Sequence, residues 1–386
     1  MTIVYIFRSM AKLAGTERVL TDKMNYLASI GYNIYIITYE QGEHPIAFKF
    51  HQNIVHIDLG TRFFTLSQYN IFKRYWKYIK LRYLFRKKME SCIKQIKPDI
   101  IIYTTYSLNV IDIITKLKCK AKKIVESHVI MGSITEENDS SNNTFIQQIK
   151  KHFIYRNLKY IKKADKIVVL TKEDARQWSQ IKKAQIIPNP VTIFPDNTVE
   201  NNSNKILCVG RLEKEKGFDL LINAWKKIAD EFPNWNIEIY GSGGEYNNLL
   251  QQIKINSLTG SIQIKPPTIN IYEQYQNSSL FILSSRYEAF GLVLIEAMSC
   301  GRPCISFNCP SGPNEIIIDG INGLLIQNGN IDDLAIKIKW MINHENERKE
   351  MGKNARIFAQ KFKKENIMQQ WIKLFNELTT NKVEEE

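Results

Sequence analysis

Two series of short apolar runs, each followed by a stretch with helical spacing, constrain the fold of this chain most strongly. In the first half, the runs that predict strands are Ile3–Phe7, Ile34–Thr38, Ile54–Leu59, Ile100–Thr104, Lys123–Glu126 and Lys166–Leu170. In the second half they are Lys205–Gly210, Asn236–Tyr240, Ile262–Ile264, Leu280–Leu283, Cys304–Ser306 and Leu324–Ile326. Strands that alternate with helices are typical of a parallel sheet covered on both faces. The sequence therefore predicts an α/β chain with two doubly wound sheets.

A proline-bearing segment separates the two series. Ile186–Val191 reads I-I-P-N-P-V, and the polar stretch Asn197–Asn204 follows it. Proline interrupts regular structure, so we place a domain boundary after residue 190. A chain of 386 residues is long enough for two domains with cores of their own. After the second series, the spacing predicts helices over Ile331–His344 and Glu347–Leu378.

The segment Leu280–Ser306 carries the clearest chemical signal. It predicts a buried strand, a turn, a helix that ends before Gly301, and another strand. Backbone N–H groups at the start of that helix form a site suited to phosphate, and they belong to Phe290, Gly291 and Leu292. Two acids, Glu288 and Glu296, flank this helix start, and carboxylates accept hydrogen bonds from sugar hydroxyls. Phosphate and sugar together indicate a nucleotide-sugar, with one acid on the donor sugar and the other on the ribose.

The same segment resembles a known family. Its S-R-Y-E-A-F-G-L-V-L-I-E-A-M-S-C-G-R-P, with seven residues between Glu288 and Glu296, is similar to the E-x7-E motif of retaining glycosyltransferases of family 4. The resemblance implies the GT-B fold, in which two Rossmann-like domains face a cleft. It also implies an N-terminal acceptor-side domain (1–190), a nucleotide-sugar domain (191–365) and a terminal helix and tail (366–386) that returns to the first domain. The alternative is an ordinary helix with one exposed acid and one capping acid.

A second motif supplies cations. Val209–Gly217 contains G-R-L-E-K-E-K-G, which resembles the family's G-R-L-x-x-x-K-G, whose Arg and Lys bind the donor diphosphate. Arg211 and Lys216 are the matching residues, and Arg can bind two phosphate oxygens at once. A solvent-exposed run of alternating charges is the alternative. The sequence contains no Asp-x-Asp, so we expect a metal-independent reaction, no metal ligands and no cofactor beyond a substrate nucleotide-sugar, most simply a UDP-sugar.

Three residues of the first half complete the expected site. His128 follows a predicted strand at its carboxyl end, where α/β sites gather, and E-S-H-V resembles the family's histidine that contacts the donor sugar. Gly15 and Thr16 begin the first predicted helix, where the family carries two glycines and this chain has Ala14-Gly15. They are candidates for contact with the donor. A structural histidine and a plain tight turn are the alternatives.

The basic charge is concentrated in the first half. The formal net charge is +14, and residues 1–190 hold 32 basic and 15 acidic residues, an excess of +17. From Arg62 to Lys88 there are nine basic residues and no acid, with Ile71, Phe72, Tyr75, Trp76, Ile79, Tyr83 and Leu84 at helical spacing. A basic, aromatic amphipathic helix is typical of a segment that lies on an anionic membrane. A second basic helix is expected over Gln147–Lys163. The alternative is that the apolar stripe packs on the first sheet.

These observations bound the function. No run approaches the ~20 apolar residues of a membrane span, and the N-terminus lacks a signal-peptide layout, so we expect a cytoplasmic enzyme, peripheral on the inner membrane surface. We expect it to move a sugar from a nucleotide donor to a glycan or lipid-linked acceptor in cell-surface polysaccharide synthesis. A nucleotide-sugar epimerase or hydrolase of the same fold is one alternative. A basic nucleic-acid-binding protein is another, but the sequence holds no recognisable nucleic-acid module.

Overall fold

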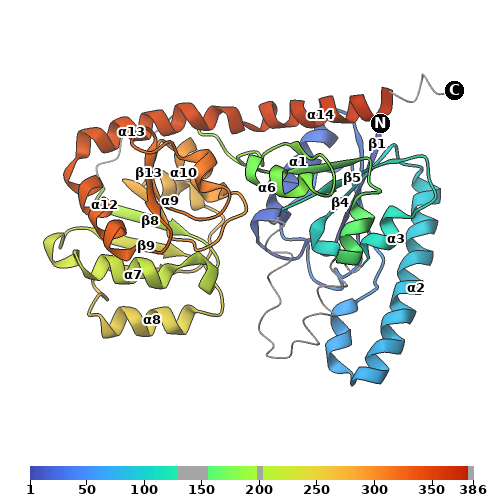
Figure 1. The fold of residues 1–386 in the computed structure, drawn as a ribbon, viewed down its shortest axis with the longest axis horizontal. Helices are drawn as coiled ribbons and strands as arrows, with labels where there is room; N and C mark the ends of the chain where they lie inside the picture. Colours follow the sequence, from blue (N-terminus) through green and yellow to red (C-terminus); the bar gives the residue numbers. More distant parts are fainter. Residues whose placement is uncertain (109, 129–154, 198–202, 381–386) are drawn as a thin grey trace. The chain divides into compact units, whose positions relative to one another are not determined.

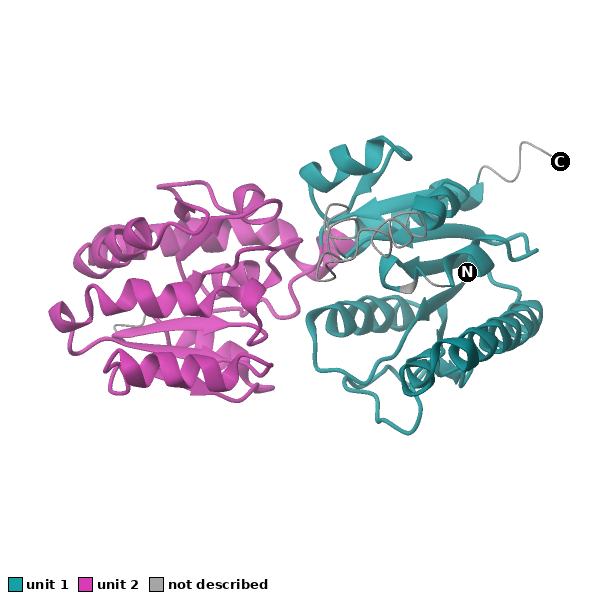
Figure 2. Cartoon of the chain, turned by 60° about the horizontal axis from the view of Figure 1, so that its bottom comes forward, with its two compact units in different colours: residues 1–188, 368–386 teal, residues 189–367 magenta. Residues whose placement is uncertain are grey.

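The computed structural model describes residues 1–108, 110–128, 155–197 and 203–380, which form two compact units (Figures 1 and 2). Unit 1 comprises Met1–Pro188 together with Met368–Glu386, and unit 2 comprises Asn189–Ile367. Each unit is a parallel sheet with helices on both faces. The expectation of two doubly wound sheets is therefore confirmed.

Unit 1 contains a seven-stranded sheet in the order β3-β2-β1-β4-β5-β6-β7, with every pair parallel. The strands are β1 (Thr2–Phe7), β2 (Asn33–Thr38), β3 (Ile54–Asp58), β4 (Ile100–Thr104), β5 (Lys122–Glu126), β6 (Lys166–Val169) and β7 (Gln185–Ile186). The helices are α1 (Gly15–Ser29), η1 (Phe63–Gln68), α2 (Ile71–Ile96), η2 (Thr105–Ser107), α3 (Ile111–Thr115) and α6 (Lys172–Ser179). Because both faces are covered, the central strands β1 and β4 are mostly apolar, and all five residues of β4 are buried.

Helix α2 departs from the expected packing. Its second half packs into the core through Phe85, Met89 and Ile93, which are buried. Six apolar residues of its first half face solvent, with exposed fractions from 41% to 83%: Ile71, Phe72, Tyr75, Trp76, Ile79 and Tyr83. In Figure 1 this half of α2 runs to the end of unit 1 that lies farthest from α14 (Lys364–Thr380). The alternative that this stripe packs on the sheet is wrong for these six residues.

Unit 2 contains a six-stranded sheet in the order β10-β9-β8-β11-β12-β13, again parallel throughout. Its strands are β8 (Lys205–Val209), β9 (Asn236–Tyr240), β10 (Ile262–Lys265), β11 (Leu280–Leu283), β12 (Cys304–Asn308) and β13 (Gly323–Gln327). Its helices are η3 (Lys214–Lys216), α7 (Phe218–Lys226), η4 (Ala229–Glu231), α8 (Tyr246–Ile255), α9 (Ile271–Gln276), α10 (Leu292–Ser299), α11 (Pro313–Ile316), α12 (Ile331–Asn343), α13 (Glu345–Ala359) and η5 (Gln360–Phe362). Strand order reverses between β8 and β11, and ligands of open α/β sheets bind at such a switch point.

The C-terminal region is not the single helix expected over Glu347–Leu378. Helix α13 ends at Ala359, η5 follows, and α14 starts a new helix at Lys364. Lys363 between them has an extended backbone (φ −52°, ψ 143°), and Phe362 is buried with its ring 5.8 Å from that of Phe290. The buried ring holds the break in place. From Met368 onward, α14 belongs to unit 1.

Two further expectations, a second basic helix and the absence of a membrane span, can be compared only with the described residues. The first eight residues of the basic helix expected over Gln147–Lys163 fall outside them, and the described remainder is helical from residue 155 to 161. Within the ranges that are described, no helix is both long enough and apolar enough to cross a membrane.

Candidate active site

The candidate site of unit 2 forms where the loops after β8 and β11 meet. These strands are neighbours in the sheet, so their carboxyl ends open on the same edge. Lys216 ends the first loop and Glu288 lies in the second. Their side chains form an ion pair with 2.5 Å between Nζ of Lys216 and Oε1 of Glu288. Only 17% and 10% of the two side chains is exposed, so the pair is largely shielded from water.

A glycine allows the two loops to approach. Gly217 follows Lys216 with φ +62°, a left-handed conformation that favours glycine. A Cβ at this position would lie 2.0 Å from the carbonyl oxygen of Ser284, which excludes any side chain. The hydroxyl of Ser284 donates to the carbonyl oxygen of Lys216 at 3.0 Å. These contacts fix Lys216 against the end of β11.

Glu288 is held by neighbours on its own loop. The hydroxyl of Ser285 donates to Oε1 of Glu288 at 2.8 Å, so this oxygen receives two bonds. Burial, with the Glu288 charge as a second cause, raises the pKa of the nearby Cys309 thiol to about 12. Cys309 is therefore a neutral thiol at physiological pH and adds no negative charge beside Glu288.

Arg211 lies on the same loop but points elsewhere. Its guanidinium pairs with Glu215 at 2.5 Å, and 66% of its side chain is exposed. The loop itself is anchored by Arg286, whose guanidinium binds both carboxylate oxygens of Asp219 at 2.7 Å. Burial would raise the pKa of Asp219, but the bonds from Arg286 outweigh it and lower that pKa. The loop thus carries an exposed cation at Arg211, paired with Glu215, and a largely shielded one at Lys216, paired with Glu288.

Helix α10 begins at Leu292, four residues after Glu288, as expected. Gly291 precedes it in a left-handed conformation (φ +84°), and no side chain caps its first turn. Phe290 is buried, and Leu292 is the first helical residue. A Cβ on Gly312 would lie 2.6 Å from the carbonyl oxygen of Phe290, so the loop after β12 packs closely on this helix start. The N-cap residue is a glycine, so no N-cap side chain accepts a hydrogen bond from the first-turn N–H groups.

Glu296 lies one turn further along α10 and is only 5% exposed. Its Oε2 accepts a hydrogen bond of 2.9 Å from the hydroxyl of Tyr275 on α9. Burial, and next the Glu296 carboxylate, raise the pKa of Tyr275 well above its usual value, so Tyr275 stays a donor. Both expected acids therefore lie in one short segment, and Glu288 contacts the expected cation Lys216.

A pocket of ≈ 350 Å³ adjoins the Arg211–Lys216 loop. It is lined at the carboxyl ends of β9 and β10 by Gly241, Ser242, Gly243, Tyr246, Ile264, Pro266 and Pro267. The N–H of Leu212 donates to the carbonyl oxygen of Ser242 at 2.9 Å, which ties the β8 loop to the pocket wall. An aromatic ring, two prolines and bare glycine backbone form a wall suited to a flat ring such as a nucleobase.

The candidates of unit 1 gather less tightly. His128 follows β5 and is 6% exposed, with Nε2 3.2 Å from Oε1 of Glu126. Its ring stacks on that of Tyr106, with 6.5 Å between centroids. Gly15 is the first residue of α1 and Thr16 the second, and no side chain caps this helix. A Cβ on Gly15 would meet no atom within 4 Å, so no steric reason for a glycine is present there.

The comparisons with known proteins agree with this geometry. Residues 192–358 match the family model described as Glycosyl transferases group 1, which covers the β8–β13 sheet and both loops of the site. An uncharacterized glycosyltransferase of Haemophilus influenzae is 27% identical over 96% of this chain and 98% of its own length. The chain is a glycosyltransferase of the GT-B type.

Two further likenesses bear on this transferase. The amylovoran biosynthesis glycosyltransferase AmsD of Erwinia amylovora is 30% identical over 55% of the chain and 62% of its own length. The fold of the pneumococcal O-GlcNAc transferase GtfA, solved with UDP and GlcNAc, matches with a TM-score of 0.75 and 17% identity over 98% of this chain and 99% of that one. At this identity the second likeness shows the GT-B fold alone.

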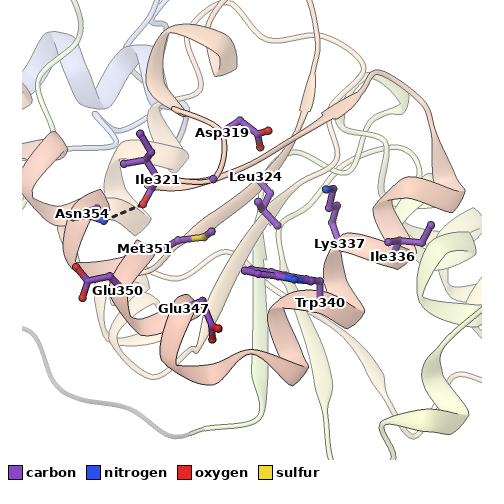
Figure 3. A pocket seen from close by; sticks show the side chains of 11 residues that line it. Asp319, Ile321, Leu324, Ile336, Lys337, Trp340, Glu347, Glu350, Met351 and Asn354 are labelled. Atoms are coloured by element: carbon purple, nitrogen blue, oxygen red, sulfur yellow. Dashed lines mark hydrogen bonds between the residues drawn. The ribbon is translucent and has the colours of Figure 1, made fainter.

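A larger pocket of the GT-B transferase lies away from these residues (Figure 3). It measures ≈ 540 Å³ and lies at the turn before β13, between α12 and α13. Trp340, Leu324 and Met351 are its main apolar side chains, and Asp319, Glu347 and Glu350 are its acids. Phosphate is disfavoured beside three carboxylates. Since the turn enters β13 at its amino end, this pocket is on the opposite sheet edge from Lys216 and Glu288.

Sequence analysis missed several residues that shape the site of the transferase. Ser284 and Ser285 bind Lys216 and Glu288, and Gly217 and Gly312 permit close loop contacts. The glycine after Lys216 was visible in the motif, and it is the one signal that could have marked the contact. The serines carried no distinguishing pattern, because serine is common at the ends of strands.

Proposed function

We propose that this chain is a retaining glycosyltransferase of family 4 that uses a nucleoside-diphosphate sugar, most simply a UDP-sugar. The observation that carries the proposal is the Lys216–Glu288 pair at the β8/β11 switch point. It sets one cation and one carboxylate side by side, next to an uncapped helix start. A diphosphate joined to a sugar presents the complementary groups, since phosphate oxygens attract the lysine and sugar hydroxyls donate to the carboxylate.

Each residue then has a role in binding the donor. Lys216 and the N–H groups of Phe290, Gly291 and Leu292 bind the diphosphate, and Arg211 turns from Glu215 to join them. Glu288 accepts hydroxyls of the donor sugar, and Glu296 accepts those of the ribose. The base occupies the pocket beside Tyr246. His128, Gly15 and Thr16 contribute from unit 1.

The reaction breaks the bond between the anomeric carbon and the β-phosphate oxygen, and negative charge grows on the leaving diphosphate. Lys216 and Arg211 stabilise that charge, so the proposal needs no metal ion. The leaving phosphate takes the proton of the acceptor hydroxyl, which attacks from the same face, and the configuration at the anomeric carbon is retained. No protein nucleophile is required for this step.

The proposed acceptor is a glycan or lipid-linked glycan in cell-surface polysaccharide synthesis. The similarity to AmsD, a glycosyltransferase of amylovoran biosynthesis, supports this class of acceptor. The UDP bound in the structure of GtfA supports a UDP-linked donor. The six exposed apolar residues of α2 support contact with an anionic membrane, as a peripheral enzyme on the inner surface. Exposed apolar area flanked by lysines is suited to a bilayer interface.

A panel of nucleotide-sugars and free nucleotides tests the proposal by thermal stabilisation, since a ligand that binds the folded state raises Tm. We expect one nucleoside diphosphate to raise Tm, and its nucleotide-sugar to raise Tm further. In Glu288→Ala the additional rise caused by the sugar should be lost. Incubation with donor alone separates the rivals. Product that forms without an acceptor identifies an epimerase or hydrolase and contradicts the proposed transfer.

A further inference from the structure

A buried ion pair lies inside unit 1, next to His128. Lys23 on α1 and Glu126 at the end of β5 form a direct salt bridge, and each side chain is 1% exposed. The ring of Trp371, on α14, covers the amine of Lys23, with Nζ 3.8 Å from the ring centroid. Trp371 itself is 1% exposed. The terminal helix thus closes the pair off from water.

Glu126 serves two partners with one oxygen. Its Oε1 binds Lys23 and lies 3.2 Å from Nε2 of His128, whose side chain is 2% exposed. Burial would raise the pKa of Glu126, but the charges of Lys23 and His128 outweigh it and lower that pKa to about 2. Glu126 is therefore a carboxylate at physiological pH, and a negative charge faces the imidazole.

Several polar atoms of this cluster have no hydrogen-bond partner in the described structure. They are Oε2 of Glu126, Nε2 of His128 and Oη of Tyr5. Nε2 of His128 is close to Oε1 of Glu126 but is not aligned with it as a hydrogen bond. Buried polar atoms without partners are costly, and in native proteins they often mark functional groups. Two of these three atoms belong to the contacting pair of Glu126 and His128.

The Lys23–Glu126 ion pair is not explained by a gain in the stability of unit 1. Removing two charges from water costs about as much as their attraction returns, so an apolar pair of similar size would stabilise the unit at least as well. What the pair does provide is a fixed charge beside His128. A carboxylate held by a lysine that is itself covered by an indole has little freedom to move.

We propose that Glu126 is a positioning residue for His128, and that Lys23, covered by Trp371, holds Glu126 in place. The proposal rests on the proposed function, since it takes His128 as a group of the transfer site. The terminal helix then also affects the site, because Trp371 on α14 shields Lys23 from water. The packing of α14 on unit 1 would influence His128 through the Lys23–Glu126 and Glu126–His128 contacts.

A double-mutant cycle tests the proposal, with Glu126→Gln, His128→Ala and the double variant. If Glu126 acts through His128, Glu126→Gln lowers kcat by about tenfold or more, as expected for a misplaced site group. Its effect in the His128→Ala background then falls below about twofold, because coupled residues are not additive. Nucleotide affinity, which depends on unit 2 in the proposed function, stays unchanged, and a cooperative urea unfolding transition of unit 1 reports that this unit is folded.

Lys23→Met leaves a buried carboxylate without its partner, so the pair variant Lys23→Met/Glu126→Gln is the stable alternative should single variants unfold. The expected result is a folded protein with the same loss of kcat. Trp371→Ala gives a smaller loss that also disappears in the His128→Ala background, and Trp371→Phe restores activity by keeping a ring over Lys23.

Three outcomes are distinguishable. Full activity of Glu126→Gln or of the pair variant overturns the positioning role, and so does an equal loss in both His128 backgrounds, which marks a purely structural pair. Full activity of His128→Ala instead removes His128 from the site. That outcome contradicts its place in the proposed function as well as this inference, whereas the first two leave the proposed function standing.

Discussion

Nζ of Lys216 lies 2.5 Å from Oε1 of Glu288, although the two residues are 72 positions apart in the sequence. Sheet topology produces this contact. The strands that precede the two loops, β8 and β11, are neighbours, and strand order reverses between them. A cation for phosphate and a carboxylate for sugar hydroxyls are therefore aligned before any ligand binds, which reduces the reorganisation that binding requires.

Replacing Lys216 by Met should lower kcat/KM for the donor by about 10²–10³, because a fixed charge facing the leaving diphosphate is lost. Steady-state kinetics with the identified nucleotide-sugar measures the loss. Lys214→Met is the matched control, since Lys214 carries the same charge on the same loop and is exposed, whereas the ion pair with Glu288 is made by Lys216. Equal losses in both variants would mean that only the net charge of the loop matters.

Gly217→Ala should destabilise unit 2 more than alanine replacements of two other glycines of this unit, Gly320 and Gly260. Two effects add: a left-handed residue with a side chain costs about 1–2 kcal/mol, and the new Cβ would meet Ser284 oxygen at 2.0 Å. Gly320→Ala isolates the first effect, because Gly320 has φ +75° and no atom within 4 Å. Gly260→Ala, in open space without a positive φ, should be nearly neutral.

Denaturant unfolding of these three alanine variants gives the ranking. The expected order of stability loss is Gly217, then Gly320, then Gly260. A Gly217 variant no less stable than the Gly320 variant would show that the loops move apart at little cost, and that their contact is not fixed.

Much of the fold could be predicted because buried parallel strands are continuous apolar runs. Ile100–Thr104, Asn236–Tyr240 and Leu280–Leu283 are strands with the expected bounds. The break between α13 and α14 could not be predicted, because residues 360–363 (Q-K-F-K) contain neither glycine nor proline. Burial of Phe362 against Phe290 makes that break, and it depends on a tertiary contact.

The candidate site could be predicted in its residues but not in its pairings. The spacing of charges in R-L-E-K-E-K does not reveal that Arg211 pairs with Glu215 while Lys216 reaches Glu288. Helical spacing likewise shows that α2 has an apolar stripe, but not that six apolar side chains of its first half are exposed to solvent. Both depend on which elements the topology places side by side.

Acid should weaken unit 1 through Glu126. Its pKa is lowered from 4.5 to about 2 in the folded protein, so the folded state binds this proton less tightly than the unfolded chain. The resulting stability is fully present above pH 4.5 and is lost as pH falls toward 2. Urea unfolding at pH 6 and pH 3 measures it. Glu126→Gln should be less stable at pH 6, and its deficit should shrink at pH 3; a constant deficit would contradict the coupling.

Glu296→Ala should weaken binding of the free nucleotide by about 1–3 kcal/mol, the cost of a lost hydrogen bond to a charged group. The reason is the proposed contact with the ribose, which is present with or without the donor sugar. Tyr275→Phe is the control, since it removes only the hydroxyl that donates to Glu296. Calorimetry that finds unchanged affinity in a folded Glu296 variant would remove this acid from the site.

The first half of α2 should bind anionic vesicles. Each basic side chain near such a surface contributes about 1 kcal/mol, within a Debye length of roughly 8–10 Å. Four replacements by Gln should therefore lower sedimentation with the vesicles: Lys73, Lys77, Lys80 and Lys87. The same number of Gln replacements on exposed helical lysines of unit 2 is the charge-matched control: Lys226, Lys254, Lys349 and Lys353.

Apolar insertion makes a separate contribution that salt does not screen. Phe72 and Trp76 are 83% and 70% exposed, so changing both to Ser removes no packing in unit 1 and should leave Tm unchanged. We expect this variant to lose the binding that remains at high salt, while the lysine variant loses the salt-sensitive part. Donor affinity should be unaffected in both, because the proposed donor contacts of unit 2 are untouched. Equal pelleting of the wild type and both variants, or none for any, would show that this surface does not bind lipid.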